Sequence, residues 1–173
     1  MIVVLIGYMA SGKSSLGKVL AEKLNYRFID LDFFIETKEA ASVKDIFKTK
    51  GEIYFRKQET LYLNTILSSN EDIVLALGGG TPCYGNNMYS IRNSPHIISI
   101  YLKASINTLV DRLESAKSKR PIISHIQEKS ELSEFIAKHL FERSPYYDLA
   151  QYKISTDGKA VEEIIQELLE ILI

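Results

Sequence analysis

Short apolar runs alternate with amphipathic segments along almost the whole chain. Apolar or half-apolar runs that predict strands lie at Val3–Ile6, Arg27–Asp30, Ile73–Leu77, Ile97–Leu102 and Lys153–Ser155. Segments with helical spacing follow Lys13, Asp32, Ser42, Glu52, Ser105, Ser130 and Lys159. Strands that alternate with helices in this way predict an α/β fold, in which helices cover both faces of a parallel sheet.

Two segments interrupt the alternation. Residues Thr81–Pro95 are rich in turn-forming residues, and residues 115–129 contain Pro121 and have no clean period. Long irregular segments inside a compact domain are usually functional or mobile. We therefore expect one domain over residues 1–173, with a mobile lid at about 115–129 that folds over a bound ligand.

The first predicted strand runs directly into the sequence GYMASGKSS, which matches the phosphate-binding P-loop pattern G-x-x-x-x-G-K-S through Gly7, Gly12, Lys13 and Ser14. Glycines allow backbone amides to point into one concavity, and the following helix adds its positive N-terminal end. Lys13 is expected to reach the β- and γ-phosphates of a nucleotide, and Ser14 to offer its hydroxyl to Mg²⁺. The alternative is an ordinary turn that happens to contain a lysine, but the strand, loop and helix occur in the order that the motif requires.

Composition narrows the class of protein. The net charge is −1, so no overall basic field points to nucleic acid or a membrane surface. The apolar N-terminal run is too short for a signal peptide or a membrane span. Cys83 is the single cysteine, which fits a reducing compartment. We expect a cytoplasmic protein and assign no role to Cys83.

Further polar residues follow the predicted strands, where open α/β sheets bind ligands. Asp30 and Asp32 end the second strand, so one carboxylate could help to hold Mg²⁺ while the other accepts a hydrogen bond from a substrate hydroxyl. The other interpretation makes Asp32 the N-cap of the next helix. The glycines 78–80 end the third strand and would let backbone approach a ligand closely.

Three arginines complete the candidate site. Arg56 lies in a helical pattern with Glu59 three residues later, Arg120 lies in the predicted lid, and Arg143 lies near the end of a helix. An arginine can bind a carboxylate through two hydrogen bonds or stabilise a phosphate during transfer. Arg56 and Glu59 could instead form a surface ion pair of little consequence.

Taken together, these motifs resemble the shikimate kinase family. The resemblance rests on GYMASGKSS, the Asp30/Asp32 pair, Phe55-Arg56 with Glu59, the glycine triplet, Arg120-Pro121, and Arg143 with Tyr147 and Ala150. It implies transfer of the ATP γ-phosphoryl group to the 3-hydroxyl of shikimate in aromatic amino-acid biosynthesis. It also implies a three-layer P-loop kinase fold with a five-stranded parallel sheet in the order 2-3-1-4-5, and a monomer.

The resemblance also implies roles for individual residues. The ATP-binding set is Ala10, Ser11, Gly12, Lys13, Ser14, Ser15, Arg112 and Arg120, and the shikimate-binding set is Asp32, Arg56, Gly78, Gly79, Gly80 and Arg143. Ser14 and Asp30 are expected at Mg²⁺, while Lys13, Asp32 and Arg120 are expected to act in catalysis. The chain departs from the common family pattern at Ala10-Ser11 and at Ser15, which are mild changes because backbone amides carry the binding.

Two alternatives stay open from the sequence. A related P-loop kinase that acts on another small polyol, such as gluconate, or on a nucleoside monophosphate would use the same phosphate loop. A non-catalytic nucleotide-binding module is disfavoured because Lys13, Ser14, Asp30, Asp32 and Arg120 are all present.

Overall fold

The computed structural model describes residues 1–116 and 122–173. Its centre is a five-stranded sheet in the order β2-β3-β1-β4-β5, in which every neighbouring pair is parallel. The strands are β1 (Ile2–Ile6), β2 (Arg27–Asp30), β3 (Ile73–Ala76), β4 (Ile97–Lys103) and β5 (Tyr152–Ser155). The predicted fold class and strand order are therefore confirmed, and the strand bounds differ from the prediction by at most one residue.

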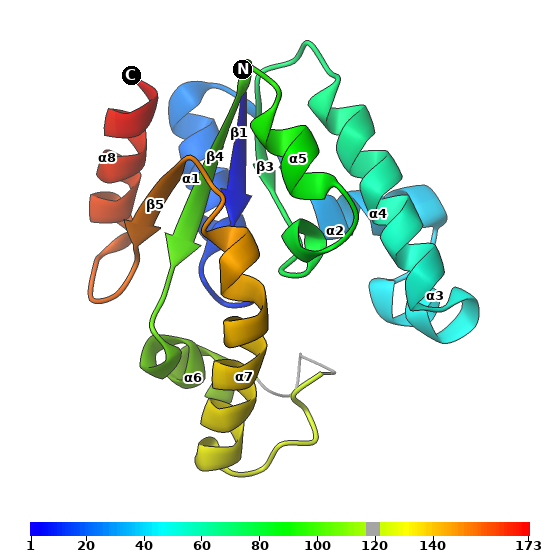
Figure 1. Cartoon of the computed structure of the whole chain (residues 1–173). Coiled ribbons are helices and arrows are strands. Elements are labelled where there is room, and N and C mark those ends of the chain that lie inside the picture. The colour runs from blue at the N-terminus through cyan, green and yellow to red at the C-terminus, as the bar shows by residue number, and fades with distance from the viewer. Residues whose placement is uncertain (117–121) are drawn as a thin grey trace.

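Helices cover both faces of the sheet (Figure 1). On one face, α1 (Lys13–Leu24) and α8 (Val161–Leu172) pack against alternate residues of the strands, such as Val3 and Leu5. The other face and its loops are covered by α2 (Leu31–Glu39), α3 (Val43–Lys50), α4 (Glu52–Leu67), α5 (Asn87–Arg92), α6 (Ile106–Glu114) and α7 (Lys129–Tyr147). This double coverage explains why β1 is apolar at every position rather than at every second one.

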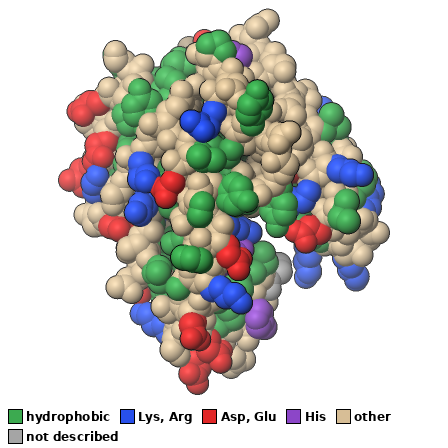
Figure 2. All heavy atoms as spheres, viewed as in Figure 1, with side chains coloured by type: hydrophobic (Ala, Val, Ile, Leu, Met, Phe, Trp, Pro, Cys, Tyr) green, Lys and Arg blue, Asp and Glu red, His purple; other side chains and the backbone are tan. Residues whose placement is uncertain are grey.

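The carboxyl ends of the strands define the functional side of the molecule. In Figure 1, β1 and β4 point toward the side on which α6 and the beginning of α7 lie. Figure 2 shows that the surface is hollowed between this part and the side that carries α3. The P-loop follows β1, Asp30 is the last residue of β2, and the glycine triplet follows β3, so all three meet at this edge.

The structure corrects one prediction about local order. Residues Thr81–Pro95 are not irregular throughout, because they form the 3-10 turn η1 (Thr81–Cys83) and then α5. The apolar residues Met88 and Ile91 of α5 are buried together with Asn87, while Tyr89 is exposed. A helix this short has too few apolar positions for a visible period.

The predicted lid at 115–129 is only partly described. Ile123 and Ile126 are buried and join the main core, and α7 begins at Lys129. Arg120, which the sequence places in the lid, lies outside the described residues. Among the described helices, none is long and apolar enough to cross a membrane.

Candidate active site

Two adjoining cavities open at the carboxyl edge of the sheet. The larger one, of about 620 Å³, is lined by the P-loop, Asp30, Asp32, Arg112 and the loop after β5. The smaller one, of about 210 Å³, is lined by Asp32, Arg56, Gly78, Gly79, Gly80 and Arg143 together with Glu59 and apolar side chains. Met9, Asp32, Gly78 and Gly79 line both, so the two cavities meet at these residues.

The P-loop backbone has the conformation that its glycines permit. Gly12 has a φ of 99° at the N-cap of α1, which residues with side chains rarely adopt. At Gly7, a β-carbon would lie 2.7 Å from the carbonyl oxygen of Leu102 on β4, which is closer than real contacts allow. Both glycines of the motif are therefore required for steric reasons.

Lys13 lies within this loop. Its ammonium group donates hydrogen bonds of 2.8 Å to the backbone carbonyls of both Gly7 and Tyr8, and only 8% of the residue is exposed. The side chain thus folds back over the concavity that its own loop forms. This arrangement holds a positive charge at the larger cavity, which Lys13 also lines.

Asp30 joins the P-loop to the start of α2. One of its carboxylate oxygens accepts a 2.6 Å hydrogen bond from the Ser14 hydroxyl, and the other accepts from the backbone N–H groups of Asp32 and Phe33. Asp30 is therefore the N-cap of α2. The interpretation of Asp32 as the cap was wrong, because α2 begins two residues earlier than expected, at Leu31.

Asp32 is left without a capping role and points into the site. The pKa of its carboxyl is raised from 3.8 to about 6, first by burial and then by the nearby carboxylates of Asp30 and Glu59, while Lys13 and Arg56 oppose the shift. A carboxyl group with such a pKa is ionised at neutral pH but holds a proton more readily than an exposed aspartate. That property suits a group that accepts a proton from a substrate.

The three glycines after β3 each make room for a different polar side chain. A β-carbon on Gly78 would lie 2.8 Å from the Asp32 carboxylate, one on Gly79 would lie 3.2 Å from Arg143, and one on Gly80 would lie 2.7 Å from Arg56. The triplet is thus the surface against which one carboxylate and two guanidinium groups gather. The structure brings together all six residues that the sequence grouped as the shikimate site.

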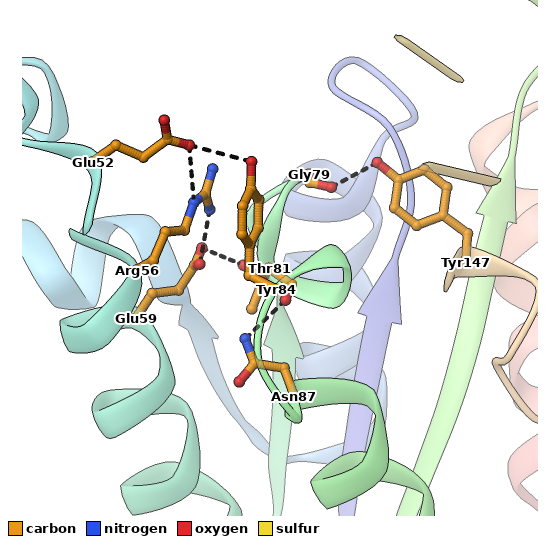
Figure 3. A network of polar contacts seen from close by, with 8 residues as sticks. All are labelled: Glu52, Arg56, Glu59, Gly79, Thr81, Tyr84, Asn87 and Tyr147. Atoms are coloured by element: carbon orange, nitrogen blue, oxygen red, sulfur yellow. Dashed lines mark hydrogen bonds and ion pairs between the residues drawn. The ribbon is translucent and has the colours of Figure 1, made fainter. Parts of the chain in front are cut away.

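Arg56 and Glu59 form a buried contact rather than a surface ion pair. An Arg56 Nη1 donates a 2.8 Å hydrogen bond to Glu59, whose side chain is 1% exposed. The other oxygen of Glu59 accepts a 2.6 Å hydrogen bond from the Thr81 hydroxyl, directly after the triplet (Figure 3). Glu59 therefore links α4 to the glycine loop. The interpretation of Arg56 and Glu59 as a surface ion pair was wrong.

The last turn of α7 reaches the triplet from the other side. Tyr147 is fully buried, and its hydroxyl donates a 2.6 Å hydrogen bond to the Gly79 carbonyl (Figure 3). Burial raises the pKa of Tyr147, so the phenol keeps its proton and remains a donor. One turn earlier on α7, Arg143 lies beside Gly79. The tyrosine thus fixes the end of the helix that carries Arg143.

At the larger cavity, Arg112 of α6 lies beside the P-loop and donates a 3.0 Å hydrogen bond to the Ala10 carbonyl. The cavity wall also includes Thr156 and Lys159, which follow β5 and which the sequence reasoning did not select. Their position after the last parallel strand is the signal that could have found them. In the smaller cavity, Met9, Val43 and Phe47 were missed because apolar wall residues carry no motif.

A family model for shikimate kinase matches residues 9–173. The chain belongs to the shikimate kinase family. A shikimate kinase of Flavobacterium johnsoniae is 48% identical over 170 residues, which cover 98% of each chain. That of Sulfurihydrogenibium is 40% identical over 166 residues, covering 95% of this chain and 93% of the relative.

Solved structures agree with the sequence comparison. A crystal structure of shikimate kinase from Bacteroides thetaiotaomicron has a TM-score of 0.90 and 36% identity, covering 99% of this chain and 98% of its own. A shikimate kinase from Acinetobacter baumannii, solved in complex with shikimate, has a TM-score of 0.87 and 31% identity, covering 99% and 92%. A gluconokinase from Sinorhizobium meliloti shares the fold, with a TM-score of 0.59, but is only 20% identical. Membership of the shikimate kinase family makes the chain an ATP-dependent phosphotransferase.

Proposed function

We propose that this enzyme transfers the γ-phosphoryl group of ATP to the 3-hydroxyl of shikimate, giving shikimate 3-phosphate. The observation that carries the proposal is the smaller cavity, in which Arg56, Arg143 and Asp32 gather around the glycine triplet. Shikimate is a small ring with one carboxylate and three hydroxyls. Two guanidinium groups for its carboxylate and a carboxylate for its hydroxyls match that chemistry.

Arg56, Arg143, Asp32 and the glycine triplet each have a role in this proposal. Arg56 and Arg143 hold the ring carboxylate, while Gly78 to Gly80 line the substrate and offer backbone N–H groups. Asp32 binds the substrate hydroxyls and accepts the proton of the one that attacks the γ-phosphorus. With a pKa of about 6, Asp32 is largely ionised at neutral pH and free to take that proton.

The larger cavity would hold ATP. The backbone from Ala10 to Ser15 surrounds the phosphates, and Lys13 supplies positive charge near the β- and γ-phosphates. Arg112 lies beside this loop, and Arg120 is proposed to reach the phosphates from the lid. Because the two cavities meet at Asp32 and Gly78, a hydroxyl beside Asp32 would face the terminal phosphate.

Mg²⁺ is the metal that the residues fit. The Ser14 hydroxyl and the Asp30 carboxylate are in direct contact at the phosphate loop, and both are hard oxygen ligands. Within the described residues, no group of three or more His, Cys, Asp and Glu side chains could hold a metal. Mg²⁺ often binds through few protein ligands, waters and substrate phosphates, and it would neutralise charge that develops on the phosphates.

Residues 1–173 would act as one domain and as a monomer, as the family resemblance implies. We also propose that the enzyme works in the cytoplasm, which the single cysteine supports.

A direct assay tests the proposed function. The purified protein should form ADP with ATP, Mg²⁺ and shikimate, and should do so far more slowly when gluconate or a nucleoside monophosphate replaces shikimate. Chelation of Mg²⁺ should stop the reaction. Preferred phosphorylation of gluconate would instead support the alternative small-polyol kinase.

Loss of either guanidinium group should weaken shikimate binding. Hydrogen bonds to charged groups contribute about 1.5–3 kcal/mol, so Arg56→Ala and Arg143→Ala should each raise the KM for shikimate by about 10- to 100-fold. The KM for ATP should change little, because neither residue lines the larger cavity. Arg92→Ala, an exposed arginine at the end of α5, is the matched control. A variant that kept the shikimate KM but lost ATP binding would rule out the carboxylate role.

A further inference from the structure

Acidic and aromatic side chains surround the Arg56 guanidinium, and we call this set, Glu52, Phe55, Glu59 and Tyr84, the cage. We infer that Tyr84 is a positioning residue for binding of the substrate carboxylate. Tyr84 follows η1, directly after the turn that continues the glycine triplet. Its ring lies over the Arg56 guanidinium, with 4.0 Å between the guanidinium carbon and the ring centroid (Figure 3). The inference rests on the proposed function, because it concerns how that substrate is held.

The cage controls Arg56 from several directions. Glu59 holds one nitrogen of the guanidinium at 2.8 Å, and Glu52 lies 3.7 Å from Nε. The Phe55 ring lies farther away, with its centroid 5.3 Å from the guanidinium carbon. Gly80 leaves space on a further side, where a β-carbon would collide with the guanidinium. The Tyr84 ring covers the flat face, which no hydrogen bond can fix.

Covering the face matters because of the side chain's freedom. An arginine loses much of its rotamer freedom when it is fixed, so a guanidinium already held in place binds a carboxylate more tightly. Glu59 alone fixes one nitrogen and permits rotation about that contact. The Tyr84 ring, which lies over the guanidinium, restricts that rotation. The N–H groups of Arg56 therefore stay at the smaller cavity, which Arg56 lines.

Tyr84 is itself well placed to act as a wall. Its hydroxyl donates a 3.2 Å hydrogen bond to Glu52, so the ring is tied to the first turn of α4. Its backbone follows the turn in which the Cys83 N–H donates to the Gly80 carbonyl at 2.9 Å. Asn87 supports the same turn by donating a 2.8 Å hydrogen bond to the Thr81 carbonyl (Figure 3). The backbone of Tyr84 and its hydroxyl group are therefore both held in place.

The position of Tyr84 outside the cavity separates this role from direct binding. Tyr84 does not line the smaller cavity, whereas Arg56 lines it. It contacts the opposite side of Arg56 instead, in a surface groove formed with Glu52, Lys57 and Thr60. We therefore expect the Tyr84 side chain to act on the substrate through Arg56.

The test is the effect of Tyr84→Leu on steady-state kinetics. A stacked cation–π contact implies a rise of about three- to tenfold in the KM for shikimate, with kcat and the KM for ATP nearly unchanged. Tyr84→Phe keeps the ring and should keep most of the parent KM. A merely structural role would instead lower the melting temperature and change kcat and both KM values together.

Two controls make the result decisive. Tyr89→Leu removes another exposed tyrosine, which is 71% exposed on α5, and should leave the KM unchanged. In an Arg56→Ala background, Tyr84→Leu should cause no further rise in the KM, because its effect passes through the missing guanidinium. An unchanged KM in Tyr84→Leu, or a full additional effect without Arg56, would overturn the inference. A parent enzyme that does not phosphorylate shikimate would overturn the proposed function, and this inference with it.

Discussion

Replacement of Lys13 by alanine should lower kcat for shikimate phosphorylation by about 10²–10³-fold. The ammonium group lies over the P-loop concavity, held by the carbonyls of Gly7 and Tyr8. Charge that develops on the phosphates during transfer would meet it in a partly dry site, where electrostatic stabilisation is large. Removing one such preorganised group typically costs a factor of this size.

The Lys13→Ala measurement needs a control for general loss of charge on α1. Lys18 is exposed on the same helix, so Lys18→Ala should keep nearly the parent kcat. A thermal melt of both variants shows whether the fold survives. If Lys13→Ala transferred phosphate at close to the parent rate, the P-loop assignment would fail.

The chemistry at the strand ends could be predicted from sequence because each group is local. A P-loop is defined by spacing within nine residues, and its lysine can reach only the concavity that those residues form. The central strands β1 and β3 were found from their apolar runs, since they are buried at every position, whereas the edge strands β2 and β5 are only partly buried and half-apolar. Their order, however, came from the family resemblance, because apolar periodicity does not say which strands pair.

The roles of neighbouring acidic residues could not be read from spacing. Asp30 and Asp32 are two residues apart, and which of them caps α2 depends on where the strand ends and the helix begins. Glu59 looked like an ordinary helix-surface partner of Arg56, because an i,i+3 spacing places two side chains on one face of a helix without saying whether that face is buried. Its burial against Thr81 depends on a contact across 22 residues of chain.

Tyr84 shows the same limit for an aromatic residue. In the sequence, Tyr84 lies in a segment rich in turn residues, and no motif or spacing connects it to Arg56 on the preceding helix. The connection exists because η1 turns the chain back toward α4 after the triplet. Tertiary contacts of this kind, rather than propensity, decide how the site is positioned.

Replacement of Asp32 by asparagine should lower kcat by about 10²-fold while leaving ATP affinity nearly intact. Loss of a general base typically costs about 10²–10⁴-fold, and a loose phosphoryl-transfer transition state places the effect at the lower end. The substitution keeps the size of the side chain and one oxygen acceptor. It also leaves the start of α2 unchanged, because Asp30 provides the cap.

The same substitution should change how stability depends on pH. The pKa of Asp32 is raised from 3.8 to about 6 in the folded protein, so its stabilising contribution is complete below about pH 4 and is lost as the pH rises through 6. At pH 7 to 8 the buried, ionised carboxylate therefore destabilises the fold. Asparagine stays neutral, so the melting temperature of Asp32→Asn relative to the parent should rise between pH 4 and pH 8.

Measured together, kcat and the melting temperature show whether Asp32 lowers the stability of the fold while it supports activity. The matched control is Asp45→Asn, which changes an exposed acidic residue in the first turn of α3 and should leave kcat unchanged. A large loss of rate together with a pH-dependent gain in melting temperature is the expected result for Asp32. An asparagine variant that is fully active, and whose melting temperature follows the parent at every pH, would move the search for the proton acceptor elsewhere in the cavity.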